Sequence, residues 1–180
     1  VLEEELLGID TRMGSLVGTQ QDNKTKLKEF KRKIDLYSDD DVNGKYLQLT
    51  HLQEHQKEIK VDIDKLKIEV KNKLDKIETL GNLEWDDNCD YCMSNPFTID
   101  AIQTKESLND DKSVAREKLE VLDGIEDKIK NLKDYHDKKV DYDRSVDTLK
   151  EIEISQNRLD SESTLLKEKK KTTLLKIKSL

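Results

Sequence analysis

Apolar residues recur along residues 2–37 at steps that alternate between four and three. The stripe consists of Leu2, Leu6, Ile9, Met13, Leu16, Gln20, Asn23, Leu27, Phe30, Ile34 and Tyr37. A mean spacing of about 3.5 residues is typical of a helix that packs along one seam against another helix. Gln20 and Asn23 form a polar pair within the stripe. Such residues weaken helix pairing but fix its register, so we interpret them as register markers.

The stretch SDDDVNGK, from Ser38 to Lys45, interrupts this pattern because consecutive Asp and Asn-Gly disfavour a continuous helix. The stripe then resumes one residue out of phase, and Gly81-Asn82 is a suitable helix end. The second stripe consists of Leu49, Leu52, Gln56, Ile59, Ile63, Leu66, Val70, Lys73, Ile77 and Leu80.

Helix signals return at Asn95-Pro96, which suits an N-cap followed by proline in the first helical position. The apolar stripe is irregular between Asp134 and Arg144. We expect its members to be Ile99, Ile102, Leu119, Leu122, Ile125, Ile129, Leu132 and Tyr135, and then Val146, Leu149, Ile152, Leu159, Leu166, Leu174 and Ile177.

The two patterned halves have matching lengths, so a chain that folds back at its centre pairs residue i with a residue near 181 minus i. The interruption at 38–45 then faces the irregular stretch at 134–144. We therefore expect an all-α protein, a long antiparallel intramolecular coiled-coil hairpin. Its parts are an ascending helix over 1–81, a hook over 82–97 and a descending helix over 98–180. A parallel or higher-order coiled coil is the alternative.

Composition favours long solvated helices, with 41% charged residues, 33% hydrophobic residues and a net charge of −7. Neither a membrane span nor a signal-like segment is visible, and the chain starts without Met, so we expect an excised fragment of an intracellular protein of the cytoplasm or nucleus. A phosphate-binding glycine loop and a Ser/His/Asp arrangement are both missing, so an enzyme is not expected from this chain alone. The acidic balance disfavours strong DNA binding by this chain.

The central stretch NLEWDDNCDYCMSNPFTID places Cys89 and Cys92 at the predicted bend. A CxxC pair has the spacing of half a tetrahedral zinc site. His51, His55 and His136 lie dozens of residues away, about 55–65 Å at helical rise. A second copy of the same bend is the simplest completion, with one Zn²⁺ per homodimer. An unliganded dithiol, a disulfide and a site with Asp ligands are the alternatives.

Several neighbours of the cysteines are candidate dimer-interface residues: Asp90, Tyr91, Met93, Trp85 and Phe97. A hairpin end has little other core, so the three aromatic residues are expected to form a small apolar cluster that shapes the turn.

A CxxC at the midpoint of a heptad-patterned chain resembles the zinc hook of SMC-like ATPases of the SbcC/Rad-fifty type. The interior Asp90-Tyr91 and the following Met93 depart from the proline and small residue common in that family, so a repair exonuclease subunit and a viral or anti-phage relative both fit. The resemblance implies that two apices join through zinc. It also implies that the intact protein is an ATPase that acts on DNA with a nuclease or accessory subunit. The alternative function is a metal-free structural or adaptor coiled coil that associates through helix seams or tip aromatics.

Overall fold

The computed structural model describes residues 1–82 and 86–179, and nearly all of these residues are helical. Five helices follow one another in this part of the chain: α1 (Leu2–Asp39), α2 (Val42–Gly81), α3 (Asp90–Ser94), α4 (Pro96–Leu132) and α5 (Asp134–Lys178). No strand occurs among the described residues, and the prediction of an all-α protein is confirmed. The helices are divided between two units, Val1–Lys45 with Tyr135–Leu180 and Tyr46–Asp134.

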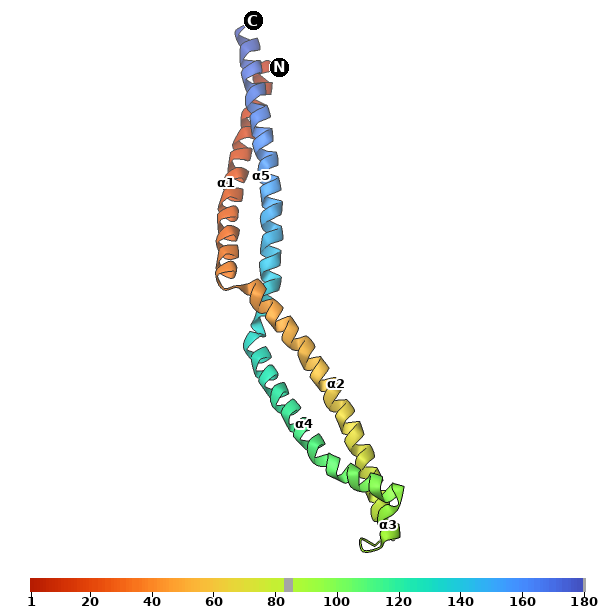
Figure 1. Ribbon diagram of the computed structural model, residues 1–180. Coiled ribbons are helices and arrows are strands. Elements are labelled where there is room, and N and C mark those ends of the chain that lie inside the picture. Colours follow the sequence, from red (N-terminus) through yellow and green to blue (C-terminus); the bar gives the residue numbers. More distant parts are fainter. Residues whose placement is uncertain (83–85, 180) are drawn as a thin grey trace. The chain divides into compact units, whose positions relative to one another are not determined.

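In the first unit, α1 and α5 run side by side in opposite directions, and both chain ends lie at the same end of this pair (Figure 1). Lys170 Nζ lies 2.6 Å from Asp10 Oδ1, and Gln20 Nε2 donates to Asp160 Oδ1 at 2.7 Å. Residue i therefore lies near residue 180 minus i, close to the register that a central fold-back requires.

The second unit contains a similar antiparallel pair, α2 and α4, joined through α3 (Figure 1). Its core is an apolar cluster centred on Ile59, Ile63 and Ile125. Lys118 Nζ lies 3.0 Å from Asp62 Oδ2 beside this cluster. Residue i therefore again lies near residue 180 minus i. Nowhere in the described part of the chain does a helix combine the length and apolar character that crossing a bilayer requires.

Every member of the two predicted stripes on α1 and α2 is buried or half-buried, except Leu80, whose side chain lies outside the described residues. On the second half of the chain, the prediction is wrong at three positions: Ile99, Leu119 and Leu174 are exposed. Their preceding neighbours take the inward positions instead, and these are Thr98, Lys118 and Thr173. Helix geometry fixes which position faces the partner helix, whether or not an apolar residue stands there.

The inward face of α5 keeps an unbroken alternation of three and four from one end of the helix to the other, but much of it is polar. Its members are Lys138, Tyr142, Ser145, Leu149, Ile152, Gln156, Leu159, Ser163, Leu166, Lys170, Thr173 and Ile177. The stretch 134–144, irregular in its apolar pattern, is therefore regular in its helical geometry. Tyrosine and lysine occupy the inward positions there.

A network of four side chains lies in the first unit beside the break between α1 and α2: Asp40, Lys45, Tyr135 and Lys138. Asp40 accepts hydrogen bonds from the ammonium groups of Lys45 and Lys138, both at 2.7 Å, and from the Tyr135 hydroxyl at 2.9 Å. Both ammonium groups also lie over the Tyr135 ring, at 4.8 Å and 4.4 Å from its centroid. The Asp40 carboxylate thus links the end of α1 to the start of α5 through three hydrogen bonds, and two cation–π contacts to the Tyr135 ring add to the same network.

The break itself depends on Asp41 and Gly44. Asp41 has a positive φ of 51°, and its carboxylate accepts the N–H of Gly44 at 3.2 Å at the start of α2. A Cβ atom on Gly44 would lie 2.3 Å from Asp41 Oδ2, so a larger residue there would displace the Asp41 carboxylate from its contact with the N–H of residue 44. Asp is among the few non-glycine residues that tolerate the left-handed conformation.

The Asp40 network predicts a pH-dependent contribution to stability. Hydrogen bonds from Lys138, Lys45 and Tyr135 hold the pKa of Asp40 well below its usual range. A carboxyl group with a lowered pKa stabilises the fold above its unfolded pKa of about 3.9 and loses that contribution as the pH falls below it. We expect Asp40→Asn to lower the thermal midpoint at pH 7, and the difference from wild type to shrink between about pH 4 and pH 2. Exposed Asp35→Asn is the control, and equal losses in both variants would contradict this role.

The polar seam of α5 predicts a stabilising substitution at Gln156. This side chain is buried, and its Oε1 lacks a hydrogen-bond partner among the described residues. We expect Gln156→Leu to raise the free energy of unfolding by about 1 kcal/mol, because an unpaired buried carbonyl is removed. Chemical denaturation measures the change, with exposed Gln21→Leu as the control. A loss of stability in Gln156→Leu would mean that the hydrogen bond from Gln156 Nε2 to Asp160 Oδ1, 2.9 Å long, outweighs the unpaired carbonyl.

Candidate metal centre

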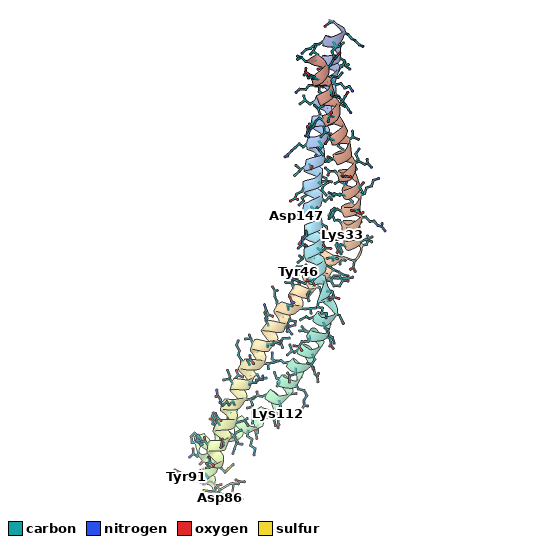
Figure 2. All side chains as sticks on the ribbon, turned by 180° about the vertical axis from the view of Figure 1, so that it is seen from behind. Lys33, Tyr46, Asp86, Tyr91, Lys112 and Asp147 are labelled. Carbon is teal, nitrogen blue, oxygen red and sulfur yellow. The ribbon has the colours of Figure 1, made fainter. Side chains whose placement is uncertain are left out.

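A compact turn leads the chain into the cysteine pair. The Asp86 carboxylate accepts the N–H of Asn88 at 2.9 Å, and the Asp86 carbonyl accepts the N–H of Cys89 at 3.1 Å. Such an Asx turn lets one side chain replace a backbone partner. Asp86 and Tyr91 lie together at the end of unit 2 where α2 and α4 are joined (Figure 2). The turn thus places Cys89 immediately before the first residue of α3.

Cys89 is the N-cap residue of α3, with extended backbone angles of φ −96° and ψ 110°. Cys92 follows within the first turn of this short helix, and the two cysteines lie 3.4 Å apart. Both are free and half-buried. Since the extended N-cap residue and a helical residue three positions later share one side of the turn, the local backbone brings the two sulfurs together.

The environment of Cys89 favours its thiolate. Hydrogen bonds from the backbone N–H of Cys92, from the Cys92 thiol and from the N–H of Tyr91 lower the pKa of the Cys89 thiol. Metal-bound sulfur is a thiolate that commonly accepts such backbone hydrogen bonds. The turn therefore favours the deprotonated form of Cys89, which is the form that binds metal.

The spacing of the pair fits zinc. Two thiolates bound to one tetrahedral Zn²⁺ at about 2.3 Å lie about 3.8 Å apart, which is close to the 3.4 Å that separates the two cysteines. Among residues 1–82 and 86–179, no group of three or more His, Cys, Asp or Glu side chains is placed to hold a metal. His51 and His55 lie exposed on α2. In the described residues, the pair offers two thiols, whereas a structural zinc site takes four ligands.

The candidate interface residues surround this pair with exposed side chains. Tyr91 is 81% exposed, and Asp90, Met93 and Phe97 are also exposed. The rings of Tyr91 and Phe97 make no contact with each other in the described structure, so the expected aromatic cluster is not formed by these two. Tyr91 is thus far more exposed than Cys89 and Cys92, which are half-buried. Trp85 lies outside the described residues.

The start of α4 fixes the far side of the turn. The Asn95 side chain caps this helix by accepting the N–H of Phe97 at 2.9 Å, and Pro96 occupies the first helical turn. This cap was predicted from the sequence and is confirmed. The structuring role of Asp86 was not predicted, although an Asp two residues before Asn88 and three before Cys89 is a recognisable turn signal.

Comparisons of the chain with protein-family models, with curated proteins and with solved structures found no match. The role of the cysteine pair is therefore inferred from its own geometry and chemistry.

The capping interaction predicts a measurable loss when Asn95 is replaced. We expect Asn95→Ala to lower the free energy of unfolding by about 1 kcal/mol, because the N–H of Phe97 loses its acceptor. Asn95→Asp retains an acceptor at the same place and should keep most of the stability. Hydrogen exchange of the first α4 amides, measured without metal, reports the effect locally. Equal protection in the two variants would show that the cap contributes nothing.

Proposed function

We propose that this chain is a zinc-mediated dimerisation module, in which Cys89 and Cys92 of two copies share one Zn²⁺. The observation that carries the proposal is a thiol pair that is close enough to chelate one ion and supplies half of the ligands that zinc takes. A two-fold axis through the ion would complete four thiolates with identical contributions from each copy. Zinc would supply binding energy and fixed geometry at this site.

Several features around the pair support joining rather than closure within one chain. Asp90, Tyr91 and Met93 are exposed beside the sulfurs, so a second copy has a surface to contact. The carboxylates of Asp86 and Asp87 are exposed as well. Asp86 already accepts the N–H of Asn88 within the turn, whereas the exposed side chain of Asp87 would face a partner or keep the end of the unit soluble.

The proposed architecture is one fold-back coiled coil with the CxxC hook at its apex. Support comes from the antiparallel pairing inside each unit and from α3, which connects α2 to α4. Joined to the resemblance to SMC-like ATPases, this makes the chain a tether between two ATPase assemblies that act on DNA. The heads and the nuclease or accessory subunit would lie in other parts of such an assembly.

A metal-free structural or adaptor coiled coil is the second candidate function. The strong exposure of Tyr91 favours it, because an outward aromatic side chain is a typical anchor of protein interfaces that need no metal. Under this alternative, Tyr91, Met93 and Phe97 contact another chain and the cysteines are spectators.

Removing one ligand separates the two candidates. We expect purified wild-type protein to contain about half a zinc per chain and to sediment as a dimer, and Cys89→Ser to be metal-free and monomeric. A chelator should give the same result in wild type, and helix content measured by circular dichroism should survive both treatments. Tyr91→Ala is the matched variant, and it should keep the zinc.

The opposite outcomes identify the alternatives. A dimer that persists without zinc and dissociates in Tyr91→Ala would assign association to the exposed side chains. One zinc per chain in a monomer would indicate a site closed by ligands of the same chain.

A further inference from the structure

A groove of about 390 Å³ runs between α2 and α4 in the second unit, away from the cysteine turn. Its floor is almost wholly apolar, and charged side chains stand along its rim. The floor consists of Ile63, Leu66, Val70, Leu74, Ala115 and Leu119. Leu74 is 51% exposed and Leu119 is 49% exposed, so two large apolar side chains meet solvent in one place.

The groove exists because the two helices contribute unequally to their seam. Along this stretch α2 presents large apolar side chains, whereas α4 presents Ala115 and Asp111. Asp111 forms an ion pair with Lys73 at 2.6 Å. A charged contact therefore lies in the seam where another leucine could have packed. The apolar stripe of α2 is therefore wider than α4 covers. Contiguous exposed apolar surface of this kind commonly marks a binding surface.

The dimensions of the groove suit a helix. From Ile63 to Leu74 the floor spans twelve residues of α2, a rise of about 16 Å, or three helical turns. An amphipathic helix lays side chains at i, i+4 and i+7 into a groove of this form. Leu74 and Leu119 are about half exposed, so a helical ligand can reach the floor of the groove.

The charged side chains along the rim of the groove favour a partner of opposite charge. Lys67, Lys71 and Lys112 line the edge. Within the described residues Lys71 and Lys112 have no ion-pair partner, and Lys67 reaches Asp64 at 3.8 Å in an exposed contact. Asp75 is the one rim carboxylate besides Asp111, which Lys73 already neutralises. The uncompensated rim charge is positive, so a partner with carboxylates beside its apolar stripe is favoured.

The same lysines argue against a second copy of this chain as the occupant. A two-fold interface places the same patch on both sides, so the positive rim with Lys71 and Lys112 would meet a second positive rim. Like charges brought together in an interface oppose association. A helix from another protein avoids this repulsion.

We propose that the α2–α4 groove binds an amphipathic helix of a partner protein, about three turns long, with Asp or Glu flanking its apolar stripe. The apolar side chains of that helix cover Leu74 and Leu119, and its carboxylates pair with Lys71 and Lys112. This interaction is independent of metal at the cysteine turn.

Two synthetic helical peptides of about three turns test the proposal, one with Leu at i, i+4 and i+7 flanked by Glu, the other with Lys in place of every Glu. Fluorescence anisotropy with the full chain, at about 0.15 M salt, should show at least about tenfold tighter binding of the Glu peptide. Leu74→Glu should weaken that binding by at least about tenfold. Ile68→Glu is the control, because Ile68 is 62% exposed on the same helix and does not line the groove.

The charge-reversed variant Lys71→Glu/Lys112→Glu should reverse the preference between the peptides, and it carries the test if Leu74→Glu loses helix content. Equal binding of both peptides, no binding of the Glu peptide up to about 1 mM, or equal effects of Leu74→Glu and Ile68→Glu would overturn the proposal. Self-association that Leu74→Glu abolishes in metal-free protein would assign the groove to a second copy instead.

Discussion

Two long helices that pack side by side must fill a narrow seam, and each seam position receives whatever residue the heptad spacing places there. In this chain that constraint has different outcomes in the two units. Around Ile59, Ile63 and Ile125 the seam is an ordinary apolar core. Along α5 it receives Ser145, Gln156 and Thr173, all buried. Side chains of this kind bury less apolar surface, so direction and register there depend more on hydrogen bonds and ion pairs across the seam.

The same constraint explains two places where polar or reactive side chains gather, the Asp40 network and the cysteine pair. Beside the break after α1, Asp40 accepts hydrogen bonds from two ammonium groups and from the Tyr135 hydroxyl. At the connection between α2 and α4, a helix of five residues cannot build a core, and caps and turns shape it instead. Cys89 and Cys92 are held together by this local geometry. A metal ion shared between copies would give that turn the stabilisation that a core gives elsewhere.

The sequence predicted the helical class, the buried faces of α1 and α2 and the Asn95 cap, because these follow from local spacing and local capping chemistry. It did not predict that Thr98, Lys118 and Thr173 face inward, because reading an apolar stripe favours the neighbouring Ile or Leu over the residue that helix geometry selects. The Asp40 network was out of reach for another reason: it joins residues about a hundred positions apart, and their contact depends on the register of the whole pair. At the turn, the cysteines were predicted as a pair, but the position of Cys89 as an N-cap depends on Asp86 and on α3, a helix too short to carry a periodic signal.

X-ray absorption spectroscopy of the zinc-loaded protein tests the shared-ion claim most directly, since the chain has two cysteines. We expect every zinc ion to be surrounded by four sulfur atoms at about 2.3 Å, which two chains together must supply. Zinc bound by two sulfur atoms and two oxygen or nitrogen atoms would contradict it, because one chain could then complete the site.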